Sequence, residues 1–340
     1  MLPRKTFRLK ITTPELINKI NPDNKKLVDK FLRNFNTKRS DTSVNSYTSN
    51  FNIFFVWNLL YNNNTFFIDI KKSQLVDFFD YAVTDLKWSS NRFAQVHSSL
   101  SSLSTFIENI LDDEYPDFKN NIKKIEKLHK ELVREKSIFS TEELENLSKW
   151  LKSKGLTQEV CLLSLIMSSG ARISELTRFT TELIDLNNVV HEGLFLETTK
   201  EMQVKGRGKT GKKIYRYIIK DIFEPHYINW LTQRDKIMSK NNQEHNYIFI
   251  KKDGSPADPN TLRRWMKKWT KFLVKTWYAH AGRHYWTTYL IKSGCEADFV
   301  QDLQKWSDSS LVSLYNDSTS KEKKWKGLDK LKANLEGSKL

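Results

Sequence analysis

Apolar side chains recur at helical spacing through the first third of the chain, with polar residues between them. The pattern predicts four helices, which span 25–36, 41–64, 71–86 and 89–111. In the second of them, Val44, Tyr47 and Phe51 share one face, and polar residues at its start can cap it. The first third is therefore expected to form a helical bundle.

The helix expected at 89–111 has two contrasting faces. Phe93, Val96 and Leu100 lie on its apolar side, whereas Ser, Asn, Gln and Arg fill the other side. Small polar side chains permit the close approach of a partner backbone, but they are also typical of a solvated face. The sequence favours the solvated face and leaves the other interpretation open.

The pattern changes after these helices. Residues 112–136 are highly charged and contain few large apolar side chains, which is typical of a linker between domains. A capping box of Ser140 or Thr141 with Glu143 starts a new helix, and Gly170 marks a tight turn between two more. Strand character appears in three stretches, at 189–198, 202–220 and 247–254.

The predicted fold class is mainly α with a small β-sheet (α+β). The length of 340 residues suits two domains, each able to bury a core. The expected segments are a basic N-terminal extension (1–24), a helical domain (25–113), a linker (114–136), a second domain (137–319) and a tail (320–340).

Charge narrows the class of partner. Lys and Arg outnumber Asp and Glu by 56 to 40, a net charge of +16, which favours a polyanion such as nucleic acid as the partner.

No apolar stretch is long enough to span a membrane, and the N-terminus lacks the apolar region of a signal peptide. The two cysteines, Cys161 and Cys295, lie in apolar or helix-like surroundings without CxxC spacing, which argues against a disulfide framework and a cysteine zinc site. We expect a cytoplasmic protein.

Two polar features of the second domain are candidates for chemistry. In "SSGARISEL", Arg172 and Glu175 share a helix face, and taken alone the motif favours a simple intrahelical pair. "KGRGKTGKK" is a glycine-punctuated basic hairpin that lacks the glycine spacing of a Walker A loop. It is either a solvated turn or a flexible hairpin that delivers Lys209 into a cleft.

Two further features lie near the end of the chain. "HAGRH" places His280, Arg283 and His284 at a helix start, where the first two can converge on one anion or merely cap a core helix. Trp306 precedes Tyr315 by nine positions, and either can be a core residue. Arginine forks suit a phosphate, a lysine can act as general acid, and a tyrosine hydroxyl can attack phosphorus. Together these residues form a set for phosphoryl transfer without a metal.

In this order the motifs resemble those of the tyrosine recombinase family, the phage integrases and Xer-type recombinases. "SSGARISEL" is similar to the first arginine box, "HAGRH" to the H-x-x-R-H box, and "KWSDSSLVSLY" to the closing box with the nucleophile. The resemblance covers about residues 25 to 316. It implies a four-helix core-binding domain and a catalytic domain that close on DNA as a C-shaped clamp.

The resemblance implies a role for each residue. Arg172 and Arg283 would clamp the scissile phosphate, and His280 would hydrogen-bond it and help to handle the tyrosine proton. Trp306, where many members have His, would bind a non-bridging oxygen. Tyr315 would attack phosphorus and form a 3′-phosphotyrosyl bond, leaving a free 5′-hydroxyl.

Other residues would support this set. Glu175 would buttress the arginine box, and His284 would lie next to Arg283 in a supporting role. The hairpin lysine would protonate the leaving oxygen. Arg207 occupies the usual lysine position, so we expect Lys209 to fill this role, with Lys205 as the second choice.

The resemblance also implies partners. Double-stranded DNA would be the substrate, and four copies would assemble on paired sites without metal, ATP or another cofactor. The tail at 320–340 either docks on a neighbouring copy or folds back, and an accessory DNA-bending protein is an open further partner. Because only about 24 residues precede the first helix, the architecture is expected to be Xer-like, without an arm-binding domain.

Basic side chains outside the motifs are candidates for DNA contacts. The expected DNA-contacting residues of the second domain are Arg263, Arg264, Lys267 and Lys268, all on one helix. Those of the first domain are Lys38, Asn91 and Arg92. Two rival functions remain: a recombinase-fold transcriptional regulator without catalysis, and a type IB topoisomerase.

Overall fold

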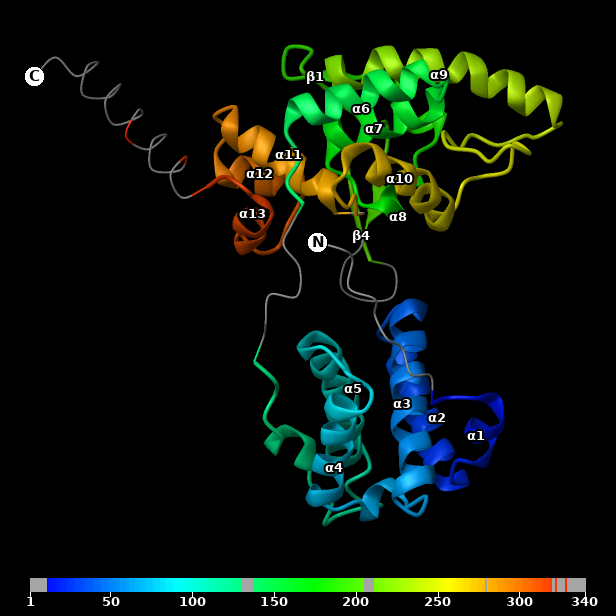
Figure 1. Cartoon of the computed structure of the whole chain (residues 1–340), viewed down its shortest axis with the longest axis vertical. Helices are drawn as coiled ribbons and strands as arrows, with labels where there is room; N and C mark the ends of the chain where they lie inside the picture. Colours follow the sequence, from blue (N-terminus) through cyan, green and yellow to red (C-terminus); the bar gives the residue numbers. More distant parts are fainter. Residues whose placement is uncertain are drawn as a thin grey trace, which may run out of the picture. The chain divides into compact units, whose positions relative to one another are not determined.

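The computed structural model describes residues 11–129, 137–204, 211–278 and 280–319, together with residues 322 and 328. The chain divides into two compact units. Of the described residues, 11–129 and Gly211 belong to unit 1, and all others belong to unit 2. Figure 1 shows both units as mainly helical.

Unit 1 is built from helices. Its helices are α1 (Pro14–Lys19), α2 (Pro22–Asn36), α3 (Asp41–Tyr61), α4 (Lys72–Thr84) and α5 (Ser90–Ile110), with 3₁₀ turns η1 (Phe67–Asp69) and η2 (Asn121–Lys124). Side-chain caps start several of them: Ser89 accepts a hydrogen bond from the Arg92 amide at the start of α5. The four helices predicted for this region are confirmed within a few residues at each end.

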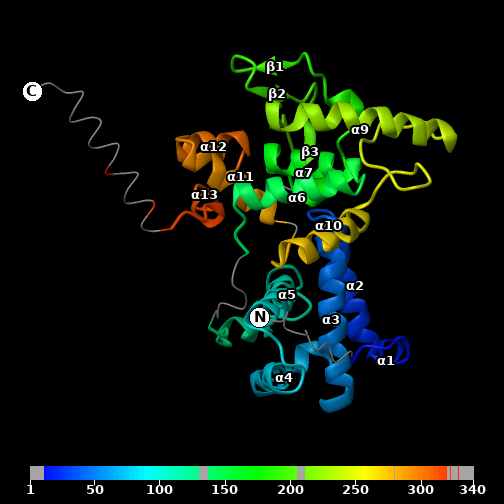
Figure 2. The same ribbon diagram turned by 45° about the horizontal axis from the view of Figure 1, so that its top comes forward.

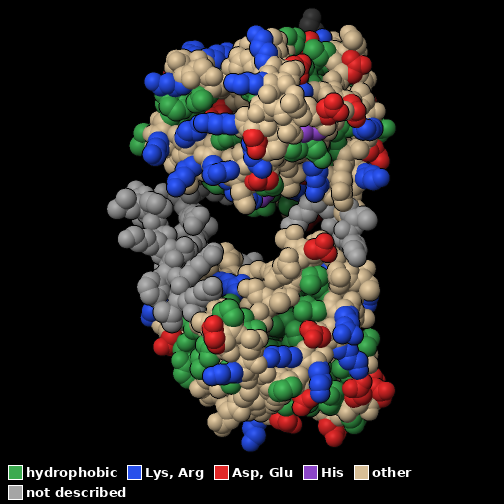
Figure 3. All heavy atoms as spheres, turned by 90° about the vertical axis from the view of Figure 1, so that its right-hand side faces the viewer, with side chains coloured by type: hydrophobic (Ala, Val, Ile, Leu, Met, Phe, Trp, Pro, Cys, Tyr) green, Lys and Arg blue, Asp and Glu red, His purple; other side chains and the backbone are tan. Residues whose placement is uncertain are grey.

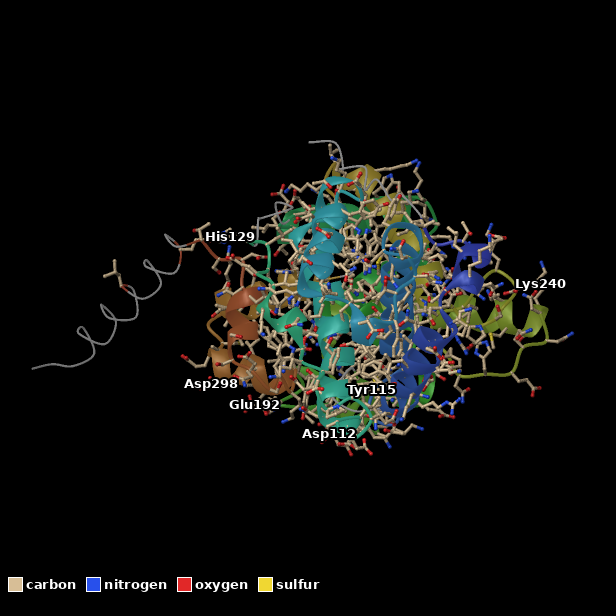
Figure 4. The ribbon with its side chains drawn as sticks, turned by 90° about the horizontal axis from the view of Figure 1, so that it is seen from below. Asp112, Tyr115, His129, Glu192, Lys240 and Asp298 are labelled. Carbon is tan, nitrogen blue, oxygen red and sulfur yellow. The ribbon has the colours of Figure 1, made fainter. Side chains whose placement is uncertain are left out.

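Two segments of unit 1 differ from the expectation. α1 lies within the segment expected to be a loose N-terminal extension, where Thr13 caps it and Pro14 occupies its first turn. Ile122 of η2 is fully buried in the core of unit 1. The described part of the expected linker therefore packs onto the helical unit. In Figure 4, Asp112 and Tyr115 mark the turn at which the chain leaves α5.

Part of the polar face of α5 packs against α3, whereas Asn91, Gln95 and Ser98 on this face are exposed. Asn50 Nδ2 donates to Ser99 Oγ at 2.8 Å, and both residues are buried. Gln95 Nε2 donates to Ser46 Oγ at 2.9 Å along the same seam. Each interpretation therefore holds for part of this face: small hydroxyl and amide side chains let the two helices bond at close range around Ser99, and the remainder is solvated.

Unit 2 combines helices with two small antiparallel sheets. Its helices are α6 (Thr141–Ser153), α7 (Thr157–Ser169), α8 (Ile173–Leu176), α9 (Lys220–Lys240), α10 (Pro259–Leu273), α11 (Ala281–Lys292), α12 (Ala297–Leu303) and α13 (Ser310–Tyr315), with the 3₁₀ turn η3 (Thr181–Leu183). Its strands are β1 (Val189–Val190), β2 (Phe195–Glu197), β3 (Met202–Val204), β4 (Lys212–Ile214) and β5 (Tyr217–Ile219). One sheet has the order β1-β2-β5 and the other pairs β3 with β4.

The core of unit 2 forms around α7, which is buried along most of its length. Figure 2 shows β1 and β2 side by side, and α6 close to α7. α11, α12 and α13 group at one end of unit 2, and in Figure 4 Asp298 of α12 lies far from Lys240 at the end of α9. The capping box of Ser140 and Glu143 is confirmed at the start of α6.

Two elements of unit 2 differ from the sequence pattern. The stretch 247–254, predicted as a strand, makes only isolated bridges at Tyr247 and Ile250. α9 was not predicted, and Pro225 stands inside its first two turns. At this sixth position the proline cannot donate the hydrogen bond to the Asp221 carbonyl oxygen that a helix would otherwise make.

Gly170 makes the turn that links α7 to the first arginine motif. Its φ is 58°, in the left-handed region that favours glycine. A Cβ added there would lie 2.9 Å from Cδ2 of Trp286, so a side chain has no room. The turn therefore fixes the direction in which the chain leaves α7 and reaches Arg172, two residues later.

Candidate active site

Arg172 is the N-cap residue of α8 and is bound to the carboxylate of Glu175. Its backbone N–H donates to Glu175 Oε2 and its Nη1 donates to Glu175 Oε1, both at 2.9 Å. The Glu175 side chain is fully buried, whereas that of Arg172 is 20% exposed. The intrahelical pair is thus real, and it leaves part of the guanidinium open to solvent.

Arg283 is buried in α11. Its Nε donates to the carbonyl oxygen of Gly170 at 3.0 Å, and its Nη2 donates to Gln304 Oε1 at 2.8 Å. Its guanidinium lies 5.4 Å from the Trp306 ring centroid and 5.7 Å from that of Tyr315. Among the described residues, no acceptor bonds to its buried Nη1. The N–H groups of Nη1 are thus left unsatisfied within the described part of the chain.

Arg216, which the sequence analysis did not single out, completes the polar centre. It is 1% exposed, and its guanidinium bonds to Glu175 Oε2 and, at 2.6 Å, to Gln304 Oε1. Arg283 Nη2 lies 3.7 Å from the same Glu175 oxygen. Burial alone would raise the pKa of Glu175, but the charges of Arg216, Arg283 and Arg172 hold it below its usual value. One carboxylate thus sits among three guanidinium groups.

Tyr315 lies at the end of α13 within a group of aromatic rings. Trp306 stacks on it with ring centroids 5.2 Å apart, and His284 meets it edge-on at 5.0 Å. The His280 ring centroid is 6.4 Å from that of Tyr315. Trp306 is buried, and its Nε1 has no hydrogen-bond partner among the residues that the structure describes. The structure therefore brings the last two motifs together.

His284 also ties down the chain that follows Tyr315. Its Nδ1 lies 3.0 and 3.1 Å from the two carboxylate oxygens of Asp317. The Asp317 amide donates to Thr288 Oγ1 at 2.8 Å, which joins this segment to α11. These bonds hold the C-terminal end of α13 against α11.

The predicted general acids Lys205 and Lys209 lie outside the described residues. The described part of the hairpin carries Lys212, whose Nζ donates to the carbonyl oxygen of Lys305 at 2.9 Å. Lys305 has a φ of 49° and directly precedes Trp306. A hairpin lysine thus reaches the turn that presents Trp306, although it was not among the predicted residues.

The predicted DNA-contacting residues of α10 have mixed surroundings. Lys268 bonds to the buried carboxylate of Glu159, which also accepts from Trp269 Nε1 at 3.0 Å. This ammonium holds α10 against α7. The other three basic residues have no hydrogen-bond partner outside α10 among the described residues. Arg263 bonds to Asn260, Arg264 bonds to Thr261, and Lys267 is exposed. Figure 3 shows many Lys and Arg side chains on the visible face of unit 2.

The candidates of unit 1 also differ in their surroundings. Arg92 Nη1 donates to Asn50 Oδ1 and Gln95 Oε1, both at 2.7 Å, so its guanidinium is partly committed to the α3–α5 seam. Asn91 and Lys38 are exposed, and Lys38 lines a groove of about 800 Å³ along α2, α5 and η2. All three candidates remain predictions.

The described residues carry neither a membrane-spanning helix nor a candidate metal cluster. No helix there is long and apolar enough to cross a bilayer. No group of three or more His, Cys, Asp or Glu side chains in the described ranges is placed to hold a metal ion. Cys161 is buried, which raises the pKa of its thiol.

Comparison with known proteins identifies the family. The phage integrase family profile matches residues 137–322, more than half of the 340-residue chain. The chain therefore belongs to the phage integrase family of tyrosine recombinases, as its motifs predicted.

Two curated relatives are tyrosine recombinases named XerC. The protein from Thermodesulfovibrio yellowstonii is 25% identical over 166 residues, which cover 46% of this chain and 49% of the relative. The protein from Lacticaseibacillus casei is 22% identical over 244 residues, 70% of this chain and 76% of the relative. The chain thus spans about half the length of the first relative and three quarters of the second.

Solved structures share the fold. XerH bound to difH substrate in a pre-cleavage complex has a TM-score of 0.65 and 15% identity, with 91% of this chain and 96% of that chain covered. A lambda integrase dimer bound to a COC′ core site has a TM-score of 0.59 and 15% identity, covering 90% and 81%. The predicted fold class, mainly helical with small antiparallel sheets, is confirmed.

Proposed function

We propose that this protein is a site-specific DNA recombinase that cleaves DNA through a 3′-phosphotyrosyl intermediate. The observation that carries the proposal is a pair of buried, unpartnered N–H groups beside a tyrosine. Among the described residues, Arg283 Nη1 and Trp306 Nε1 lack acceptors, and both side chains contact the Tyr315 ring. Buried donors without acceptors are rare, and an oxyanion would satisfy both.

The chemistry of the proposed reaction follows from these groups. The Tyr315 oxygen attacks the scissile phosphorus, and the bond from phosphorus to the 5′ oxygen breaks. His280, whose ring lies near that of Tyr315, helps to accept the tyrosine proton. Arg172 and Arg283 bind the non-bridging oxygens and offset the charge that develops on them.

A hairpin lysine would supply the proton that the departing 5′ oxygen takes up. We keep Lys209 as the first candidate and Lys205 as the second. No water enters this step, so the phosphotyrosine conserves the energy of the broken bond for rejoining. The reaction requires neither a metal nor ATP under this proposal.

The partners belong to the same proposal. Double-stranded DNA is the substrate, and four copies assemble on two paired sites, with the tail at 320–340 as a candidate docking segment. The protein acts in the cytoplasm, on the DNA of a phage or another mobile element, and an accessory DNA-bending protein is a candidate partner. Its net charge of +16 supports binding to a polyanion. Arg263, Arg264, Lys267 and Lys268 are the proposed DNA contacts of α10.

Covalent trapping tests the proposal. The protein is mixed with nicked suicide duplexes made from DNA that flanks its gene, and adducts that resist SDS are sought. We expect an adduct with the native protein and with Tyr247→Phe, an exposed tyrosine of the same unit, but none with Tyr315→Phe. Tight sequence-specific binding without any adduct would instead favour the catalytically idle transcriptional regulator. Relaxation of supercoils without sequence preference would favour a topoisomerase.

A further inference from the structure

Gln304 is a neutral side chain at the centre of the cationic cluster. It is 4% exposed and follows the last residue of α12. Its Oε1 accepts from Arg216 Nη1 at 2.6 Å and from Arg283 Nη2 at 2.8 Å. Its Nε2 donates to the carbonyl oxygen of Ser169 at 2.8 Å. Every polar atom of this side chain is therefore committed to the arginines or to the end of α7.

We propose that Gln304 is a positioning residue for the phosphate site: it orients Arg283 while leaving the positive charge of the site intact. The inference rests on the proposed function and deepens it. With Nε held by Gly170 and Nη2 held by Gln304, the Arg283 guanidinium is fixed at two of its three nitrogens. The remaining nitrogen, Nη1, has no acceptor among the described residues.

The charge count explains why a neutral residue matters here. Arg172, Arg216 and Arg283 bring three positive charges, and Glu175 brings one negative charge, which leaves a net charge of +2 in the cluster. A phosphodiester carries one negative charge, and a pentavalent transition state concentrates more on the non-bridging oxygens. A carboxylate at position 304 would accept the same two hydrogen bonds, would lose the bond that Nε2 donates to Ser169, and would reduce the net charge to +1.

Gln304 also connects this cluster to the segment that carries Trp306. The Trp306 amide donates to the Gln301 carbonyl oxygen at 3.0 Å, and Gln301 Nε2 donates to the Trp306 carbonyl oxygen at 3.0 Å. The turn between α12 and Trp306 is thus defined, and its first residue is anchored to Ser169 and both buried arginines. One amide therefore holds Arg283 directly and anchors the start of the turn that leads to Trp306.

The test compares Gln304→Glu with a matched control, Gln158→Glu. Gln158 is a partly buried glutamine of unit 2. Its Nε2 donates to the Ile250 carbonyl oxygen, and its Oε1 accepts from the Ile250 amide. Single-turnover cleavage is measured on suicide duplexes with a normal scissile phosphodiester and with a neutral methylphosphonate at that position. DNA affinity and thermal unfolding are measured in parallel.

For Gln304→Glu we expect about a 100-fold slower cleavage of the phosphodiester, the scale on which removal of transition-state charge stabilisation acts. On the methylphosphonate, which lacks the charge, we expect rates within about fivefold of the native protein. DNA affinity should change by less than about threefold, because most phosphate contacts lie elsewhere. Gln158→Glu should cleave both substrates like the native protein.

Three outcomes would overturn the proposal. The first is an equal loss of cleavage rate on both substrates in Gln304→Glu. The second is a loss below about threefold on the phosphodiester, and the third is no cleavage of the methylphosphonate by either the variant or the native protein. Should Gln304→Glu fail to fold, Gln304→Met removes the shared acceptor without adding charge. It is then expected to slow both substrates equally, and unchanged rates would count against any positioning role. Absence of an adduct with the native protein would refute the proposed function itself and is a separate result.

Discussion

Replacing Gly170 by alanine tests how tightly the arginine motif is built into unit 2. The substitution requires a left-handed backbone, which costs a residue with a Cβ about 1–2 kcal/mol. The new methyl group would also lie 2.9 Å from Trp286 Cδ2, and overpacking of this kind costs about 1–3 kcal/mol more. The expected loss of unfolding free energy is therefore about 2–5 kcal/mol.

Gly155 provides the matched control. It follows α6 with a φ of 67°, and nothing lies within 4 Å of an added Cβ. Gly155→Ala should therefore lose only the backbone contribution, about 1–2 kcal/mol. Urea unfolding of both variants, followed by circular dichroism, measures the difference. Equal losses would refute the steric argument.

The same pair of variants separates stability from catalysis. The Gly170 carbonyl oxygen accepts the Arg283 Nε hydrogen bond, so displacement of this turn should misalign that guanidinium. We expect Gly170→Ala to slow adduct formation under conditions in which both variants are fully folded, and Gly155→Ala to leave it unchanged. Similar adduct rates for the two would show that Arg283 does not depend on this turn.

Three further predictions concern the lysines and one buried histidine. Lys209→Ala should slow cleavage about 100-fold, and a 5′-bridging phosphorothiolate, whose thiolate leaves without a proton, should restore the rate; no restoration would exclude it as the general acid. Lys267→Ala should weaken binding to all DNA sequences and lower the salt slope, whereas a loss at one base position with an unchanged slope would contradict a phosphate contact. Burial lowers the pKa of His97, so the unfolded chain binds its proton more readily, and unfolding free energy should fall as the pH drops below about 6.5. Urea titrations between pH 8 and pH 5 should show a weaker pH dependence for His97→Phe, and an unchanged dependence would contradict this assignment.

The sequence predicted the helices of unit 1 because long amphipathic segments carry their own periodicity. It predicted the grouping of Trp306 and Tyr315 with "HAGRH" only through the order of the motifs, since these residues meet by tertiary packing. The basic residues of α10 were predicted from their spacing alone, and this spacing could not predict the ion pair of Lys268. Its partner Glu159 lies on another helix, and nothing local indicates the pair.

The sequence around Arg216 contains a pattern from which its burial could have been predicted. Ile214, Arg216 and Ile218 alternate along the return of the hairpin, and all three are buried. An arginine in the apolar phase of such an alternation indicates a buried charge that needs a partner. Gln304 similarly follows Val300 and Leu303 on the inner side of α12. Their partners Glu175 and Arg283 could not be inferred, because they lie far away along the chain.

α13, which carries the proposed nucleophile Tyr315, is short and buries few of its side chains. It has six residues and only Val312 among them is buried, whereas α7 is buried at eleven of its thirteen positions. Short elements with few buried contacts open locally at a small fraction of the global unfolding free energy. The amide hydrogens of α13 should accordingly exchange with solvent far sooner than those of α7. We therefore expect the segment that carries Tyr315 to open locally more readily than the arginine centre.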